Sequence, residues 1–170
     1  MTPAQDTARF SPRASIIPRP APARDSGLMG GTIILTLDGE QCAEAIRPGA
    51  RVITRDSGMA RVEEVSRLTR LVPLVSIAAG SLGDTRPDQD LILPASQAVL
   101  IRDWRSQAMF GRAQALVEAR ALIDGEFIRD LGRREVVLHQ LHFDRPHVIY
   151  AGGLELGTGD APALALRPAA

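Results

Sequence analysis

Short apolar stretches alternate with tight-turn residues along residues 31–56. Within this region, the segment 33–37 places Ile or Leu at every second position, which is the spacing of a pleated strand. Asp-Gly follows at 38–39 and predicts a hairpin, because both residues tolerate the positive φ of a primed turn. Pro-Gly at 48–49 and Asp-Ser-Gly at 56–58 mark two more turns, with a strand between them. The region therefore predicts a run of short antiparallel strands.

Further short strands are expected along the rest of the chain. Pro73 should end one of them, because proline cannot donate to a β-ladder, and Trp104 is expected in a polar turn that covers an edge of the core. We expect a single short helix at 118–123. Strands are expected at 60–69, 74–79, 91–93, 99–101, 127–130, 136–143 and 147–151, with the fifth and sixth forming a hairpin. This pattern predicts an all-β fold with at most one short helix, and it does not distinguish a sandwich, a barrel and a horseshoe.

Composition narrows the classes of protein and partner. A length of 170 residues suits one domain with a real core. Hydrophobic residues make up 45% of the chain but aromatic residues only 4%, so the core should consist mainly of Val, Ile, Leu and Ala. The 20 basic residues are all Arg and are balanced by 20 acidic ones, which argues against binding to nucleic acid or an acidic membrane. A protein partner of unknown identity is left open.

The first 26 residues differ in composition from the rest. They hold five prolines and four arginines with few apolar residues, which is typical of disorder. They lack the apolar core of a signal peptide, and no run elsewhere is long enough to span a membrane. We expect a disordered leader at 1–26, a folded domain at 27–157 and a flexible tail at 158–170. A cytoplasmic location follows, with non-classical secretion left open.

The sequence offers little for a metal or cofactor to bind. Cys42 is the only cysteine, which excludes an internal disulfide and any zinc site with several cysteines. His139 and His142 lie three positions apart on one expected strand, so they point to opposite faces, and His139 is expected in the core. A zinc site formed by His142, His147 and Asp144 would lack a further ligand. We therefore expect no metal and no cofactor.

Several motifs occur in a defined order. They are Gly-Thr at 31–32, Asp-Gly at 38–39, Ile-Arg-Pro-Gly at 46–49, Val-Ile-Thr-Arg-Asp-Ser-Gly at 52–58, and the segments 90–101, 102–111 and 141–145. This order resembles the Hint domain, the hedgehog/intein autoprocessing module, in its bacterial (alphaproteobacterial-type) branch. The resemblance covers roughly residues 27–157 and implies a flattened, horseshoe-like β fold with pseudo-twofold symmetry.

The resemblance also implies a chemistry. In Hint modules the first residue is a Cys or Ser that attacks the carbonyl of the preceding peptide bond. A His in a Thr-x-x-His motif commonly stabilises the oxyanion and protonates the departing amide nitrogen. In this branch the nucleophile stands four residues before the Gly-Thr pair, which here is Gly27, and the motif His falls at Gln97. Gln140 and Pro146 stand at two further positions where a His is common, and the chain has no Asn for intein-type cyclisation.

Four chemical positions are thus altered while the scaffold motifs persist. This combination indicates a Hint-like scaffold without the chemistry, so we lean against an enzyme. Ser26 would supply a nucleophile if the register shifts by one residue. Cys42 is expected to be a small buried apolar residue rather than a nucleophile. Asp144 and Arg145 are expected to form an ion pair or to lock a turn.

Three interpretations stay open. The first is a non-catalytic module that binds a partner or itself through a groove lined by Gln97, Thr32 and the residues near His142. The second is a self-processing protein that uses Ser26. The third is an unrelated all-β hydrolase or binding domain that matches the motifs by chance.

Overall fold

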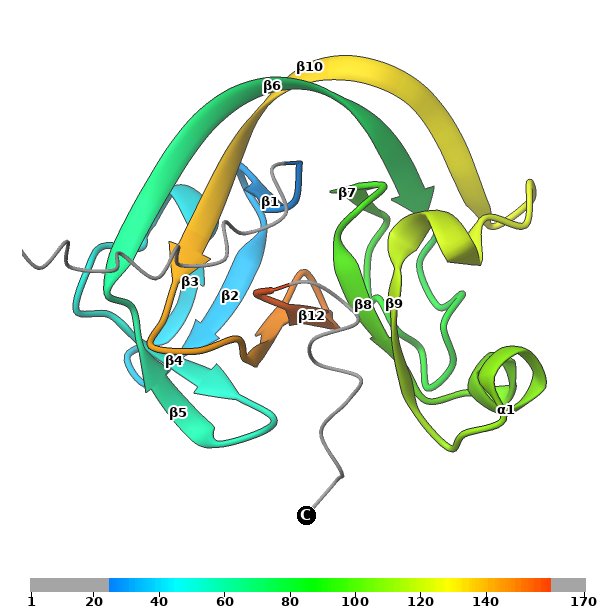
Figure 1. The fold of residues 1–170 in the computed structure, drawn as a ribbon, viewed down its shortest axis with the longest axis horizontal. Helices are drawn as coiled ribbons and strands as arrows, with labels where there is room; N and C mark the ends of the chain where they lie inside the picture. The colour runs from blue at the N-terminus through cyan, green and yellow to red at the C-terminus, as the bar shows by residue number, and fades with distance from the viewer. Residues whose placement is uncertain (1–24, 160–170) are drawn as a thin grey trace, which may run out of the picture.

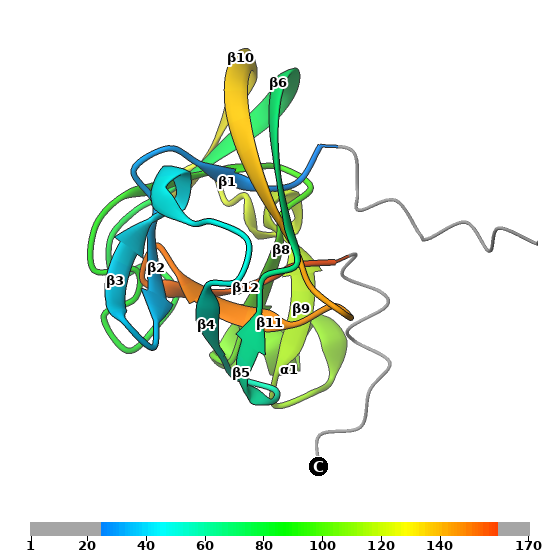
Figure 2. The same ribbon diagram turned by 90° about the vertical axis from the view of Figure 1, so that its left-hand side faces the viewer.

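The computed structural model describes residues 25–159, which form two β-sheets, one α-helix and two 3-10 turns. Two long strands, β6 (Glu64–Ile77) and β10 (Ile128–His142), form an arch over two groups of short strands (Figure 1). Seen from the side, the arch stands above the short strands (Figure 2). The prediction of an all-β, horseshoe-like fold with at most one short helix is confirmed.

All strand pairings in the described residues are antiparallel. The four-stranded sheet has the order β1 (Leu28–Met29), β10, β6, β7 (Leu91–Pro94). The eight-stranded sheet has the order β3 (Gly39–Cys42), β2 (Ile33–Thr36), β4 (Arg51–Thr54), β11 (Val148–Ala151), β12 (Leu154–Gly157), β8 (Ala98–Ile101), β9 (Ala115–Glu118), and β5 (Gly58–Arg61) pairs with β4.

The opening hairpins form where the turn residues predict them. Strands β2 and β3 pair from Ile33 opposite Cys42 to Thr36 opposite Gly39, and Gly39 has a φ of +103°. On β2 the buried face carries Ile34 and Thr36, whereas Ile33 is 39% exposed. The alternation predicted for this segment is therefore present, and its more polar face is the buried one.

The prediction that Pro73 ends a strand is wrong. β6 continues through Pro73, which lies opposite Arg133 of β10. On the other side of β6, strand β7 pairs only with Leu74–Ile77 and ends before it reaches Pro73. The missing N–H of Pro73 therefore has no strand beside it to which it would have donated. The Pro73 carbonyl still accepts a hydrogen bond from the N–H of Ala95 at 2.9 Å. Proline is tolerated here because no ladder hydrogen bond is lost.

The hairpin predicted between 127–130 and 136–143 is also wrong. Both segments belong to the single strand β10, which pairs with β6 over almost its whole length. Gly132 has a φ of +71°, and the register shifts between Asp130 and Gly132. The Asp130 carboxylate accepts a hydrogen bond from the Gly132 N–H at 2.8 Å. The residues that suggested a turn form a β-bulge instead, which inserts one residue without reversing the chain.

The helix lies at a different place from the one predicted. Trp104 begins α1 (Trp104–Phe110) rather than lying in a turn over the core, and its side chain is 70% exposed. Asp103 caps the helix through the Arg105 N–H, and Gly111 ends it at a φ of +66°. The segment predicted as a helix, 118–123, is the end of β9 followed by a 3-10 turn (Ala119–Leu122). Strand β12 was not predicted at all.

The core is aliphatic, as the composition predicts. Its members that are at most 2% exposed include Ile34, Ile46, Val52, Ile77, Leu93, Ile101, Ile128, Ile149 and Leu156. Most of the predicted leader and tail lies outside residues 25–159, but Thr158 at the start of the tail donates its N–H to the carbonyl of His147. No helix within the described residues is long and apolar enough to cross a membrane.

A candidate junction site around the Ser26–Gly27 peptide bond

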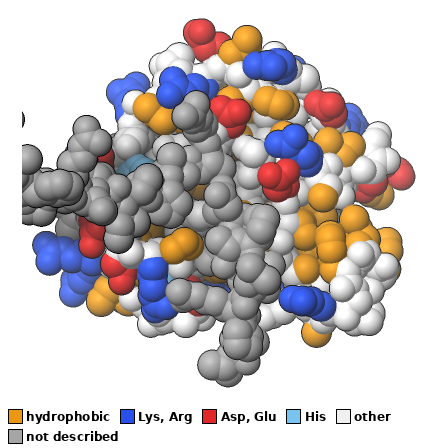
Figure 3. All heavy atoms as spheres, in the orientation of Figure 1, with side chains coloured by type: hydrophobic (Ala, Val, Ile, Leu, Met, Phe, Trp, Pro, Cys, Tyr) orange, Lys and Arg blue, Asp and Glu red, His pale blue; other side chains and the backbone are white. Residues whose placement is uncertain are grey.

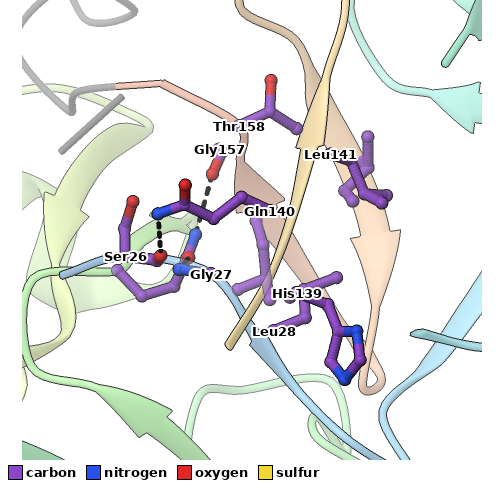
Figure 4. A pocket seen from close by; sticks show the side chains of 11 residues that line it. Ser26, Gly27, Leu28, His139, Gln140, Leu141, Gly157 and Thr158 are labelled. Atoms are coloured by element: carbon purple, nitrogen blue, oxygen red, sulfur yellow. Dashed lines mark hydrogen bonds between the residues drawn. The ribbon is translucent and has the colours of Figure 1, made fainter. Parts of the chain in front are cut away.

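A small cavity lies where the chain enters and leaves the folded domain. It is lined by residues 26–28, 139–141 and 156–158, together with Gln97 and Ile149. These segments come from β1, β10 and β12 and from the turn before β8, and their side chains surround the Ser26–Gly27 peptide bond (Figure 4). The cavity volume of about 30 Å³ is enough for one or two water-sized groups.

Gly27 fits this place because it has no side chain. Its φ is +143°, a conformation that L side chains rarely adopt. A Cβ atom at this position would lie 3.2 Å from the His139 carbonyl oxygen, 3.2 Å from Gln140 Cγ and 3.3 Å from Leu138 Cβ. The pairing of Leu28 with His139 draws the backbone of β1 this close to β10. A Cys or Ser at this position would therefore be strained, and its neighbours would have to shift by a few tenths of an ångström to admit its Cβ.

Gln97 binds the nitrogen side of the Ser26–Gly27 bond. Its side chain is almost fully buried, and its Oε1 accepts a hydrogen bond from the Gly27 N–H at 3.1 Å. Its Nε2 donates to the carbonyl oxygens of Gly157 at 2.7 Å and Ala98 at 3.1 Å. Because two carbonyls require a donor and one N–H requires an acceptor, the orientation of the amide is fixed by its three partners.

Gln140 binds the other side of the same bond. Its Nε2 donates a 2.7 Å hydrogen bond to the carbonyl oxygen of Ser26. Figure 4 shows the Gln140 side chain reaching this peptide group from β10. A donor at the carbonyl oxygen suits an oxygen that gains negative charge, whereas an acceptor at the amide N–H keeps the proton on the nitrogen. The site thus retains an oxyanion-type contact and lacks a donor for the leaving nitrogen.

His139 lies beside the cavity but does not reach this bond. Its ring points away from Gln140 in Figure 4, and it is 6% exposed, as expected for a core histidine. Burial lowers the pKa of His139, because desolvation disfavours the imidazolium; Glu44 opposes this shift and Arg67 adds to it. The ring is therefore not directed at the Ser26–Gly27 bond.

The other predicted candidates do not line the cavity. Thr32 contacts Met29 through its backbone N–H, and Cys42 is a half-buried free thiol at the end of β3. His142 Nε2 lies 2.8 Å from the Ser66 hydroxyl. The groove predicted from Thr32 and the residues near His142 is therefore replaced by the cavity around Gly27.

The sequence did not reveal the surroundings of His147. This side chain is 2% exposed, and its Nδ1 lies 2.8 Å from Asp56 Oδ2 while its Nε2 lies 3.1 Å from Asp144 Oδ1. The hydrogen bond with His147 lowers the pKa of Asp144. Asp144 therefore pairs with His147, and its carboxylate also accepts a hydrogen bond from the Arg145 backbone, which fits the turn lock expected for Asp144 and Arg145. The described residues contain no group of three or more His, Cys, Asp or Glu side chains that could hold a metal ion.

Residues in the turn between β4 and β5 form hydrogen bonds with β11 and β12. Asp56 Oδ1 accepts the Val148 N–H at 2.9 Å, and the neighbouring Arg55 places Nη1 3.1 Å from Glu155 Oε1. The same carboxylate oxygen lies 3.1 Å from Arg102 Nη2 and 3.8 Å from Arg86 Nη1. The Thr-Arg-Asp motif, which was the signal in the sequence, thus anchors the turn to β11 and β12. We call Arg55, Arg86 and Arg102 around Glu155 the arginine cluster.

Comparison with known proteins agrees with this fold. The sequence matches the family model of the Hint domain over residues 26–158, so the chain belongs to the Hint-domain family. The structure is similar to the bacterial intein-like domain from Clostridium thermocellum, with a TM-score of 0.52 and 16% identity over 77% of this chain and 96% of that chain. It is also similar to the gp41-1 intein, with a TM-score of 0.50 and 14% identity over 77% and 97% of the two chains. No curated protein matches the sequence.

Proposed function

We propose that this Hint-domain protein does not perform an acyl shift at Gly27 and that it serves as a binding or scaffold module. The hydrogen bond from the Gly27 N–H to Gln97 Oε1 carries this proposal. Cleavage of the Ser26–Gly27 bond requires the Gly27 nitrogen to gain a proton, and Gln97 presents an acceptor there. The amide cannot simply reverse, because its Nε2 is held by the carbonyls of Ala98 and Gly157. Loss of a general acid alone costs about 10²–10⁴-fold in rate.

The nucleophile is missing as well. Gly27 has no side chain to supply a nucleophilic atom, and its tight contacts with β10 disfavour a larger residue in this backbone conformation. The Thr158 hydroxyl, which also lines the cavity, is engaged with the backbone of His147. The donor from Gln140 to the Ser26 carbonyl oxygen remains, but a stabilised oxyanion needs an attacking group before it can form.

The geometry favours this proposal over self-processing by Ser26. A Ser26 nucleophile would attack the carbonyl of Asp25, and the departing nitrogen would be that of Ser26. Both glutamines instead contact the following peptide bond, through the Ser26 carbonyl and the Gly27 N–H. The polar groups of the cavity are therefore one residue out of place for that reaction.

Intact-mass measurement tests the proposal. We expect a single species of 18.2 kDa after long incubation with hydroxylamine or with a thiol, because no ester or thioester forms. A product that begins at Ser26 or Gly27 would contradict it. The variant Ser26→Ala is the matched control: if a product appears in the unmodified protein and disappears in this variant, the self-processing interpretation replaces ours.

A further inference from the structure

Helix α1 presents apolar side chains to solvent. Trp104 is 70% exposed, Met109 50% and Phe110 42%, and we call these three residues the α1 patch. The only buried residue of the helix is Ser106, whose hydroxyl finds no hydrogen-bond partner among the described residues. A helix of seven residues gains little stability from its own backbone, and this one gains little from the core. Figure 3 shows hydrophobic side chains gathered on the side of the molecule where α1 lies.

Positive charge lies at the base of this helix. Arg102 precedes α1 by two residues, and Arg55 Nη2 contacts Gln114, which follows it, at 3.3 Å. In the arginine cluster three guanidinium groups share one carboxylate oxygen of Glu155, so the cluster carries an excess of two positive charges. The side chains of Arg55 and Arg102 are each 32% exposed, so part of each guanidinium faces solvent.

Nearby acidic groups leave this excess in place. Asp103 caps α1 and forms an ion pair with Arg105, whose guanidinium lies 5.1 Å from the centroid of the Trp104 ring. Asp124 lies close enough to Arg105 to have its pKa lowered in part by that charge, although its backbone hydrogen bonds matter more. Asp103 is thus engaged with Arg105 and Asp124 with backbone N–H groups, whereas the ion pairs of the arginine cluster are made with Glu155.

From these observations we propose that the α1 patch and the arginine cluster together form a docking surface for a partner protein segment that carries carboxylates and apolar side chains. Carboxylates bind guanidinium groups through paired, charge-assisted hydrogen bonds. Exposed Trp and Arg side chains contribute most strongly to protein interfaces. The inference rests on the proposed binding role and adds a surface and the chemistry of the partner to it. It does not involve the junction site, so self-cleavage and loss of docking are detected by separate measurements.

Trp104 is the only tryptophan of the chain, so its fluorescence reports directly on this surface. The probe is a synthetic amphipathic peptide of Glu and Leu, and the matched peptide has Gln in place of Glu. We expect the Glu/Leu peptide to shift the Trp104 emission to shorter wavelength in a saturable way, because the exposed ring leaves water. The Gln/Leu peptide should give no saturable shift, and added salt should weaken the response.

Variants locate the binding surface. We expect Arg102→Gln and, independently, Phe110→Ser to weaken binding of the Glu/Leu peptide by about fivefold or more. Phe110 is exposed, so its replacement leaves the core intact. Arg70→Gln is the control, because Arg70 lies on the arch formed by β6, and this change should leave the affinity unchanged.

Four results would overturn the proposal. They are the absence of a shift with the Glu/Leu peptide, an equal shift with the Gln/Leu peptide, a response only to nucleic acid or to vesicles of anionic lipid, and a shift that depends on protein concentration alone together with a dimer in light scattering. The last would assign the α1 patch to a second copy of this chain.

Discussion

Arg55 and Glu155, which are one hundred positions apart in the sequence, are joined by a 3.1 Å contact between Nη1 and Oε1. The Glu155 carboxylate is 5% exposed and is shared with Arg86 and Arg102. It is the one anion in the arginine cluster, so it holds the β4–β5 turn, β8 and β12 in place together. A buried carboxylate in this position is tolerated because three cations surround it.

Replacing Glu155 with Gln should therefore destabilise the fold. The variant leaves three guanidinium groups facing one another without an anion, and we expect a loss of about 2–3 kcal/mol in the free energy of unfolding. This is below the full cost of breaking a buried ion pair, because two of the arginines are a third exposed. Urea denaturation measures the loss. Glu118→Gln is the control, since the Glu118–Arg120 pair is largely exposed and should cost about 1 kcal/mol or less.

Gln97 should be important for stability rather than for catalysis. Gln97→Met keeps the approximate size of the side chain but removes three hydrogen bonds and leaves the Gly27 N–H and the Gly157 carbonyl without this partner. We expect a loss of about 2–4 kcal/mol in thermal or urea unfolding. Gln107→Met on the exposed surface of α1 is the control and should change stability by less than about 0.5 kcal/mol. Equal losses of stability in the two variants would show that Gln97 has no special structural role.

Gly27 should resist replacement even by the smallest side chain. Gly27→Ala forces a Cβ atom toward the backbone of β10 at a φ of +143°, and we expect it to cost about 1–3 kcal/mol. Gly30→Ala is the control, because the nearest atom to a Cβ there is Glu44 Oε2 at 3.9 Å. Unfolding curves of both variants measure the difference, and a harmless Gly27→Ala would mean that the junction tolerates a side chain after all.

Asp124 should contribute a pH-dependent part of the stability. Its Oδ1 accepts the N–H groups of Glu126, Phe127 and Ile128, each at 2.9 Å, and the pKa of Asp124 is lowered, chiefly by the bond from Ile128. A lowered folded-state pKa gives stability that is complete above the unfolded pKa of about 3.9 and is lost as the pH falls through the folded pKa.

The variant Asp124→Asn isolates this contribution. It keeps an acceptor oxygen and does not titrate, so its stability should fall less steeply than that of the unmodified protein as the pH is lowered below about 4. Thermal unfolding across the acid range compares the two proteins. Parallel curves would show that the carboxylate of Asp124 is not preferentially stabilised in the folded state.

Local signals in the sequence predicted the part of the fold that depends on turns. The hairpin predicted at 38–39 is present, but its turn residues are Leu37 and Asp38 and only Gly39 of the Asp-Gly pair has a positive φ, so the turn is not a primed one. The sequence also contains the residues that begin and end α1, the capping Asp103 and the positive-φ Gly111. The helix was not predicted because the segment is too short to show a helical period. Pro73 and Gly132 misled the prediction, because their effect depends on which neighbouring strand is present.

In the candidate site, too, the sequence predicted which residues are involved but not the contacts that depend on the folded structure. The family resemblance gave Gly27, Gln97 and Gln140 as positions, and the structure brings all three to one peptide bond. Which atom of the Gln97 amide faces the bond depends on the carbonyls of Ala98 and Gly157, and no sequence pattern encodes that. The contact of His147 with Asp56 spans 91 positions, so it becomes visible only after the sheet has formed.

One consequence follows from the cavity at the junction. Because Gly27 and Gly157 share a single hydrogen-bonding partner, the points where the polypeptide enters and leaves the domain are neighbours in space. A longer polypeptide interrupted by this domain would resume almost where it had stopped. Insertion of this domain into a surface loop of a host would therefore leave the host's own segments close together, and this closeness depends on two backbone groups and one amide rather than on any reaction.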